Sequence, residues 1–315
     1  MMATTPTGRF APTPSGRLHL GNILCAMLAY LSVRAKGGRF LLRIEDVDVP
    51  RCPRRLAQQC IDDLTWLGFT WDEAVIYQSD RSDIYRAAIE QLQQGGHTYP
   101  CFCTRAQLMS LAAPNLGDTQ VIYQRTCSQL SPEEAAEKAK TRAPAIRLRV
   151  PDEDVSFTDG LFGVQSENLE RDCGDFILRR SDGLYGYQLA VVVDDALQGV
   201  TEVVRGRDIL TATPRQLYLQ RLLGWEAPTY VHIPLLVDSQ GRRLAKRDKD
   251  LDLTALAQRF TPVEILGRLA FSAGLLDEVR PATLEELIPL FDWQRVKKAD
   301  LRLPADMSSG DPQKA

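Results

Sequence analysis

The stretch that decides the fold of this chain reads Arg9-Phe10-Ala11-Pro12-Thr13-Pro14-Ser15-Gly16-Arg17-Leu18-His19-Leu20-Gly21-Asn22. It runs from a short apolar strand through a turn rich in proline and glycine into a helix that begins near His19. A helix N-terminus presents unpaired N–H groups and the positive end of a dipole, which together suit a phosphate. Gly21 removes a side chain that would keep a nucleotide off this backbone, and His19 can donate a hydrogen bond to a phosphate oxygen. Because ordinary turns can carry the same short motif, the surrounding sequence has to decide between the two interpretations.

Outward from this stretch, the hydrophobic pattern predicts alternating strands and helices and therefore an α/β fold. The expected strands are 9–11, 40–44, 145–150, 200–205 and 231–237. The expected helices are 20–36, with its apolar residues on one face, 53–67, 81–94, 132–140, 184–195, 208–223, 262–276 and 283–290. A strand, a helix and a second strand at this spacing form a right-handed crossover, so the sheet is predicted to be parallel.

Composition places the chain in the globular class. Its 315 residues are 44% hydrophobic and 25% charged, which is enough for a sizeable core. Apolar runs stay well below the roughly 20 residues that span a bilayer. Residues 1–7 lack the basic region and the apolar core of a signal peptide, so we expect a cytoplasmic protein without a membrane partner.

The formal net charge of −3 is unlike that of a protein covered by nucleic acid. Any RNA contact would have to be local. Short basic clusters occur at Arg51, Arg54 and Arg55 and between Arg242 and Lys249. Clusters of this size are usually solvated faces, although they also suit one RNA loop.

The segment between residues 97 and 145 contains a candidate metal site. Cys101-Phe102-Cys103 is followed by Tyr123 and Cys127, and three thiolates with a fourth donor can close a tetrahedral zinc site. The Cys-x-Cys spacing is tighter than usual, so three unliganded cysteines near a turn are the alternative. The other cysteines belong to no such cluster and are expected to be small buried or half-buried residues: Cys25, Cys52, Cys60 and Cys173.

Several motifs, in the same order, resemble those of the glutamyl-type class I aminoacyl-tRNA synthetases. Residues 8–16 followed by His19-Leu20-Gly21-Asn22 resemble their signature region, and residues 39–48, ending in Glu45-Asp46-Val47-Asp48, resemble their second strand. The resemblance covers about residues 8–290. It implies a Rossmann-like parallel sheet with a zinc-containing insertion and a small helical C-terminal part.

The resemblance also implies the amino-acid site. The segment Arg9, Phe10, Ala11, Pro12 and Thr13 would line it, with Arg9 holding the side-chain carboxylate of glutamate. Glu45 would meet the ammonium group, while Tyr187 and Arg205 would complete the pocket. Each residue also has an ordinary structural role, but all lie at or just after the expected carboxyl ends of strands, where open α/β sheets bind ligands.

For ATP, the resemblance implies His19, Gly21, Asn22, Arg243 and Lys246, with His19, Gly21 and Lys246 in catalytic roles. Arg243-Leu244-Ala245-Lys246-Arg247 resembles the family's Lys-Met-Ser-Lys-Ser loop, with Lys246 at its second lysine. It departs from that pattern, notably at Ala245, which lacks the serine hydroxyl. An exposed basic hairpin is the alternative for this loop taken alone.

For metals, the family's Cys-x-Cys and Tyr-x-x-x-Cys pattern implies one structural zinc on Cys101, Cys103, Tyr123 and Cys127. Mg²⁺ is expected to accompany ATP. Asp194-Asp195 is a weak candidate for Mg²⁺, and a polar strand–helix junction is the preferred interpretation of this pair.

The implied reaction has two steps. The glutamate carboxylate attacks the α-phosphate of ATP to give glutamyl-adenylate and pyrophosphate, and the acyl group then passes to an RNA hydroxyl. Only about sixty residues follow Leu253, too few for the anticodon-reading domains of the ordinary glutamyl enzymes. The chain is most similar to a short group that transfers glutamate to queuosine at the wobble position of tRNA(Asp).

The resulting domain prediction is a catalytic domain of 8–96 and 145–237, a zinc-binding insertion of 97–144, a signature loop and helical subdomain of 238–305, and a disordered tail of 306–315. We expect a monomer. Two alternatives stay open at this point: an adenylate-forming nucleotidyltransferase that acts on a small acid without RNA, and a non-catalytic paralogue that binds zinc and RNA.

Overall fold

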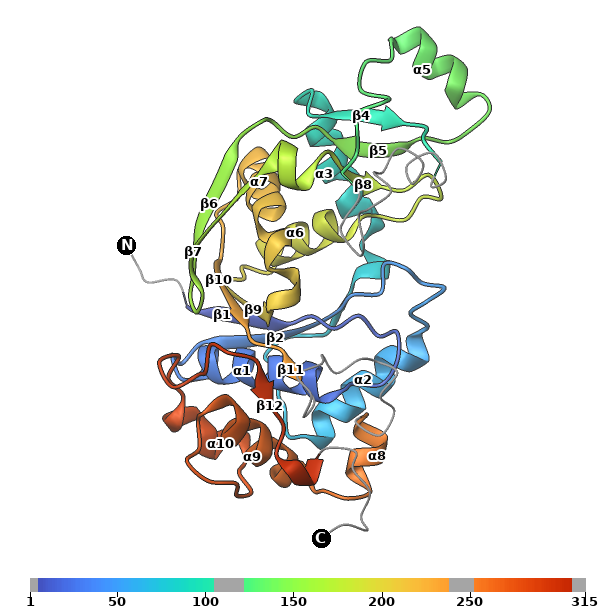
Figure 1. Cartoon of the computed structure of the whole chain (residues 1–315). Coiled ribbons are helices and arrows are strands. Elements are labelled where there is room, and N and C mark those ends of the chain that lie inside the picture. The colour runs from blue at the N-terminus through green and yellow to red at the C-terminus, as the bar shows by residue number, and fades with distance from the viewer. Residues whose placement is uncertain (1–4, 105–121, 238–251, 308–315) are drawn as a thin grey trace.

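The computed structural model describes residues 5–104, 122–237 and 252–307 and confirms the α/β fold. A parallel sheet of five strands, in the order β10-β9-β1-β2-β3, crosses the middle of the molecule (Figure 1). Its strands are β1 (Thr7–Phe10), β2 (Arg39–Ile44), β3 (Ile76–Tyr77), β9 (Glu202–Gly206) and β10 (Thr229–Ile233). The chain leaves β1 toward β2 on one side and returns through β9 and β10 on the other. The sheet is therefore doubly wound, with its switch point between β1 and β9.

Helices cover both faces of this sheet. On one face lie α1 (Leu20–Arg34) and α2 (Arg54–Trp66), with α8 (Leu253–Ala257), α9 (Pro262–Ala273) and α10 (Leu284–Leu287) packed behind them (Figure 1). On the other face lie α3 (Ser82–Gln94), α6 (Tyr187–Leu197) and α7 (Thr213–Leu223). Each layer has its own buried apolar cluster, so the sheet separates two cores.

Helix α1 differs from its prediction, because it is apolar on nearly all sides rather than on one face. Eleven of its fifteen residues are buried, from Leu20 to Val33. The helix is enclosed by the sheet on one side and by α9 and α10 on the other. A helix that is apolar all round is one buried on all sides.

A second, antiparallel sheet lies at the far end of the molecule from the C-terminal helices (Figure 1). It joins β4 (Thr98–Cys101), β5 (Ala145–Leu148) and β8 (Phe176–Arg179), and the helix α5 (Pro132–Ala139) lies beside it. The expected domain boundary at residues 144 and 145 thus falls inside a sheet. Because β5 pairs with β4 and β8, the strand belongs with the cysteine segment and not with the central sheet.

The sequence did not predict a long hairpin, formed by β6 (Asp154–Asp159) and β7 (Gly163–Asn168). Its tip reaches the central sheet, where the backbone N–H of Gly160 donates to the carbonyl of Tyr230 in β10 at 2.9 Å. A Cβ atom at Gly160 would lie 2.7 Å from Cγ2 of Val231, so any other residue here would force Val231 to shift.

The predicted strand 231–237 is interrupted at Pro234, which has no N–H to continue a ladder. The short strand β11 (Leu236–Val237) then pairs with β12 (Leu301–Arg302) near the end of the chain. Asp306 and Met307, the first residues of the predicted disordered tail, are ordered instead. Asp306 binds Arg268 at 2.6 Å and Met307 is wholly buried, while residues 308–315 lie outside the described part.

Within the described ranges, none of the helices combines the length and the apolar character that a membrane span requires.

Candidate active site and metal centre

A cavity of about 360 Å³ opens at the switch point of the sheet, between the carboxyl ends of β1 and β9. This is the position at which doubly wound sheets bind their ligands. Ten of the residues predicted from the sequence line it: Phe10, Ala11, Pro12, Thr13, His19, Gly21, Asn22, Glu45, Tyr187 and Arg205. Arg243 and Lys246 lie outside the described residues.

The N-terminus of α1 opens into this cavity. His19 is the N-cap residue, and its Nδ1 accepts a hydrogen bond from the N–H of Gly21 at 3.1 Å. An imidazole that accepts at Nδ1 carries its proton on Nε2, which makes Nε2 the donor of the ring. Asn22 completes the cap, since its Oδ1 accepts from the N–H of His19 at 3.3 Å. Its expected role in ATP binding is thus accompanied by a structural one.

The described residues on either side of segment 238–251 both adjoin the cavity. Leu236, just before the segment, is part of the lining, and Asp252, just after it, forms a β-bridge with His19. The N–H of Leu253 donates to the carbonyl of Leu18 at 3.1 Å. The described residues that flank segment 238–251 therefore lie at the cavity, and those that follow it lie beside the N-terminus of α1.

Arg205, at the end of β9, is a buried cation with neutral partners. Its Nε donates to Nε2 of His232 at 2.9 Å, its Nη1 to Gln216 at 2.6 Å and its Nη2 to Thr213 at 2.7 Å. In the described part of the chain, no carboxylate lies within ion-pair distance of this guanidinium, and Arg205 as a residue is only 4% exposed. Buried charges are as a rule paired, so this site favours an anionic ligand.

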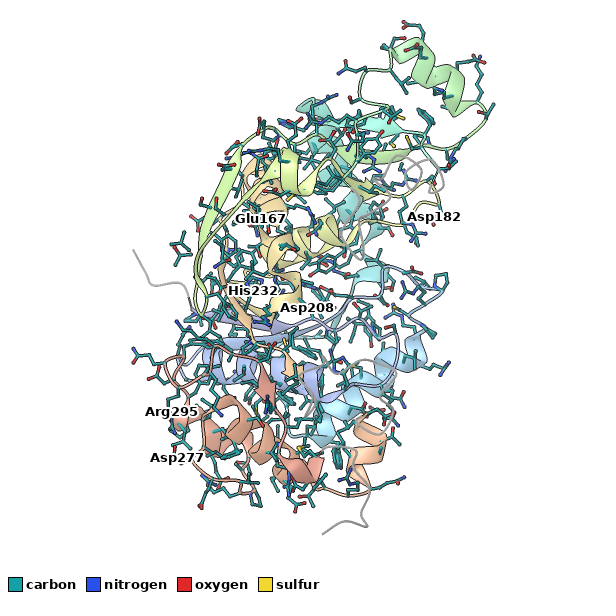
Figure 2. The ribbon with its side chains drawn as sticks, viewed as in Figure 1. Glu167, Asp182, Asp208, His232, Asp277 and Arg295 are labelled. Carbon is teal, nitrogen blue, oxygen red and sulfur yellow. The ribbon has the colours of Figure 1, made fainter. Side chains whose placement is uncertain are left out.

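Two residues behind Arg205 were not predicted. Nδ1 of His232 in β10 lies 2.6 Å from Oδ2 of Asp159 at the hairpin tip, and both side chains are fully buried. Burial lowers the pKa of His232 below its ordinary value. Burial alone would raise the pKa of Asp159, but its hydrogen bonds from His232 and two backbone N–H groups outweigh this and lower it. No sequence signal joins the two residues, because they are 73 positions apart. Figure 2 shows His232 and Asp208, another unpredicted lining residue, at the middle of the molecule.

Arg9 is not among the lining residues. It is buried beneath the cavity, where its Nε binds Oδ1 of Asp195 at 3.0 Å. Asp195 also binds Nη1 of Arg43 at 2.8 Å. The predicted role of Arg9 as the ligand of a carboxylate would therefore require it to act beside an existing ion pair.

Asp194 and Asp195 lie within α6 rather than at a strand–helix junction, and both are saturated by protein donors. Asp194 accepts hydrogen bonds from Gln78, Arg81 and Tyr85 at 2.6 to 2.8 Å. The charges of these carboxylates are already neutralised by Arg9, Arg43 and Arg81, so the structure does not support the weak Mg²⁺ candidate.

Glu45, at the end of β2, contributes a carboxylate to the cavity wall. Burial raises its pKa, although Arg43 and Arg9 oppose this effect. Its Oε1 lies 3.4 Å from Nη2 of Arg43. Cys25 also lines the cavity, and burial raises the pKa of its thiol to about 12, so it stays protonated at neutral pH.

The four predicted metal ligands converge beside β4. The Sγ atoms of Cys101, Cys103 and Cys127 lie within 4.8 Å of one another. The phenol oxygen of Tyr123 is 3.4 Å from Sγ of Cys101 and 3.6 Å from Sγ of Cys103, and the Sγ atoms of Cys103 and Cys127 are 3.6 Å apart. Metal–sulfur bonds of about 2.3 Å place tetrahedral thiolates roughly 3.8 Å apart, so the donors fit one metal ion.

The chain is similar to known proteins in both sequence and fold. Residues 7–298 match the family described as tRNA synthetases class I (E and Q), catalytic domain. A glutamyl-Q tRNA(Asp) synthetase from Symbiobacterium thermophilum is 48% identical over 311 residues, which are 95% of this chain and 96% of that protein. The protein of the same name from Nitratidesulfovibrio vulgaris is 45% identical, with the same shares covered.

Among solved structures, a glutamate tRNA ligase from Elizabethkingia meningosepticum in complex with its amino acid is similar to the whole fold. It superposes with a TM-score of 0.84 at 27% identity, over 96% of this chain and 68% of that one.

Proposed function

This chain belongs to the class I glutamyl and glutaminyl tRNA synthetase family, and from that premise we propose that it activates L-glutamate with ATP and transfers the glutamate to queuosine in the anticodon loop of tRNA(Asp). The transfer of glutamate to tRNA follows from the relatives. The adenylate intermediate and the wobble nucleoside are the finer part of the proposal.

The observation that carries the amino-acid assignment is the charge of the cavity. Arg205 offers a buried guanidinium with neutral partners, and Glu45 offers a carboxylate in the same cavity. A dicarboxylic amino acid needs a cation for its side-chain carboxylate and an acid for its ammonium group. We assign the carboxylate first to Arg205 and second to Arg9, whose charge Asp195 already neutralises.

The N-terminus of α1 is assigned to the phosphates. Nε2 of His19 would donate to an α-phosphate oxygen as charge develops there, and the positive end of the helix would add to this stabilisation. No protein side chain needs to attack the substrate, because the glutamate carboxylate is the nucleophile. Positioning and electrostatics would then supply most of the rate. Lys246 keeps its predicted catalytic role, which is to stabilise, with His19, the charge that develops on the phosphates in the transition state.

We assign one zinc ion to Cys101, Cys103, Tyr123 and Cys127. All four corners of the site are protein atoms, which is typical of a structural site without an open position for water. When bound, the metal would hold β4 to the segment that carries Tyr123 and Cys127.

The acceptor assignment rests on the extent of the matches. The two glutamyl-Q tRNA(Asp) synthetases are matched over 96% of their length, whereas 68% of the glutamate tRNA ligase is covered. This difference supports queuosine over the tRNA 3′ end as the acceptor. It also favours an enzyme that acts on tRNA over the RNA-independent nucleotidyltransferase and over the non-catalytic paralogue.

The test is incorporation of labelled glutamate, with ATP, into tRNA from cells that contain queuosine and from cells that lack it. Label only on the queuosine-containing tRNA is the expected result. Equal label on both would indicate the 3′ end and overturn the queuosine assignment. Absence of label with intact glutamate-dependent ATP–pyrophosphate exchange would indicate adenylate formation alone, and absence of both would indicate a binding protein.

A further inference from the structure

We propose that Asp159 and His232 are positioning residues that orient the guanidinium of Arg205 toward the substrate carboxylate. The inference rests on the proposed function and adds to it two residues outside the cavity wall. It follows from the hydrogen bonds that join the hairpin tip, β10 and β9.

The first step is the anchoring of Asp159. Its Oδ1 accepts from the backbone N–H groups of Leu161 and Phe162 at 3.0 and 2.9 Å. Its Oδ2 accepts from the backbone N–H and from Nδ1 of His232 at 3.0 and 2.6 Å. Four hydrogen bonds fix the carboxylate, and therefore fix the edge of the imidazole that it faces.

The second step is the tautomer of His232. A carboxylate at Nδ1 holds the ring proton on that nitrogen, which leaves a lone pair on Nε2. Nε of Arg205 always carries a proton and lies 2.9 Å from Nε2, so the imidazole accepts from the arginine. A protonated or oppositely tautomerised His232 would place two N–H groups against each other.

The third step is what this bond leaves available on Arg205. Thr213 and Gln216 accept one N–H each from Nη2 and Nη1. Each terminal nitrogen has two N–H groups, so one on each stays without an acceptor among the described residues. This pair can bind a carboxylate in a bidentate manner if the guanidinium plane is held, and His232 holds it through Nε.

A purely structural role for His232 makes a different prediction. The imidazole stacks on Tyr230, with ring centroids 6.3 Å apart and planes inclined by 11°. Phenylalanine would keep this stacking and lose the acceptor, whereas glutamine would lose the ring and place an amide oxygen near the position of Nε2. Positioning therefore predicts that His232→Gln is the milder change for glutamate, and packing predicts that His232→Phe is milder.

The kinetic experiment measures KM for glutamate and for ATP in pyrophosphate exchange. His232→Phe should raise KM for glutamate about tenfold, the expected effect of one charge-assisted hydrogen bond, with KM for ATP within about twofold of wild type. His232→Gln should recover most of this loss. His97→Phe, the same substitution at a histidine near β4, is the matched control and should leave both constants unchanged.

A pH profile gives a readout that packing would not move. The charged groups around His232 are Asp159 from the hairpin, Arg205 from β9 and Asp208 from the turn after β9. Uptake of a proton by His232 would abolish its acceptor, so kcat/KM for glutamate should fall on the acid side in the wild type. In His232→Gln that component of the profile should be absent.

Nitrogen NMR of ¹⁵N-histidine protein tests the tautomer without any substrate. The chain has three histidines, and the signal that His232→Gln removes belongs to His232. We expect a protonated Nδ1 and an unprotonated Nε2 at neutral pH. Asp159→Asn should weaken or reverse this preference.

The outcomes separate the two proposals. A wild-type protein without glutamate-dependent exchange would overturn the proposed function and this inference with it. An active wild type with a charged or Nε2-protonated His232, or with unchanged KM for glutamate in His232→Phe, would overturn the inference alone.

Discussion

Nη1 of Arg43 lies 2.8 Å from Oδ1 of Asp195 beneath the floor of the cavity, where both side chains are almost completely buried. Asp195 also neutralises Arg9, so one carboxylate serves two buried guanidinium groups. Burial alone would raise the pKa of Asp195, but the charges of Arg9 and Arg43 lower it and keep the carboxylate ionised.

Replacement of this carboxylate should be costly. Asp195→Asn keeps the shape but leaves Arg9 and Arg43 with less compensation, and breaking such a buried pair typically costs about 3–5 kcal/mol. Urea unfolding followed by circular dichroism would measure the loss. Asp182→Asn is the control, because Asp182 binds Arg180 at the exposed edge of the molecule (Figure 2) and should contribute less than about 1 kcal/mol. Equal effects of the two substitutions would contradict this account.

The cysteine cluster predicts that each protein chain binds one metal ion. Cys103→Ser should release the ion and loosen the sheet of β4, β5 and β8, since the free energy of metal binding is also folding free energy. Elemental analysis would give the stoichiometry, and limited proteolysis would report the loosening. Cys173→Ser, at a buried cysteine outside the cluster, should retain the metal. Full retention of metal in Cys103→Ser would remove Cys103 from the set of ligands.

Gly21 is expected to be sensitive for a reason beyond the approach of a nucleotide. A Cβ atom there would lie 3.0 Å from Cε1 and 3.1 Å from Nδ1 of His19, so Gly21→Ala should push the imidazole from its place. We expect kcat for pyrophosphate exchange to fall at least about tenfold with little change in melting temperature. Gly16→Ala is the comparison, because its Cβ would meet no atom within 4 Å and cannot displace His19. A kcat for Gly21→Ala equal to that of Gly16→Ala would contradict this reasoning.

Lys246→Ala tests the predicted cationic loop. Loss of the charge should lower the rate of adenylate formation by about two orders of magnitude, because developing charge on the phosphates would lose a partner. The melting temperature should stay at the wild-type value. Unchanged pyrophosphate exchange would exclude the role assigned to Lys246.

Stability should depend on pH through His232. Its pKa is lowered in the folded protein, so between its ordinary value of 6.5 and its folded value only the unfolded chain takes up a proton. The contribution of His232 to the free energy of unfolding should therefore be fully present above about pH 6.5. It should decrease as the pH falls from there toward the lowered pKa of the folded state. His232→Gln should reduce this dependence. Urea titrations at about pH 7.5 and about pH 5.5 would measure the loss of unfolding free energy between the two pH values. An equal loss in the wild type and in His232→Gln would contradict the prediction.

The parts of the site that follow one another in the chain were predictable from the sequence. The proline and glycine turn, the cap at His19 and the acidic end of β2 each have a local cause, and all three line the cavity. The spacing of the cysteines and Tyr123 likewise predicted a cluster of four donors, and the structure places these donors close together. These features depend on residues close in sequence and on the rule that parallel strands end at one edge of a sheet.

The parts that depend on distant pairs were not predictable. The partner of Arg9 is 186 residues away, and nothing in the sequence around Asp195 indicates an ion pair. One strand of the hairpin, β6, does have the sequence pattern of a strand, because Val155 and Phe157 alternate with polar residues. In β7 the apolar Val164 is 77% exposed, so its pattern gives no buried face from which a strand could be predicted.

The pairing of β11 with β12 links the wall of the cavity to the last part of the described chain. The N–H of Leu301 donates to the carbonyl of Leu235 at 2.9 Å, and Oδ1 of Asp300 accepts from the N–H of Leu235 at 3.0 Å. Leu235 and Leu236 are themselves lining residues. During synthesis, residues 10–45 leave the ribosome early, but α9 and α10, which enclose α1, follow much later, and the wall at Leu235 gains its support only after residue 301. A nascent chain would therefore carry most of the lining residues long before it could close the cavity around a ligand.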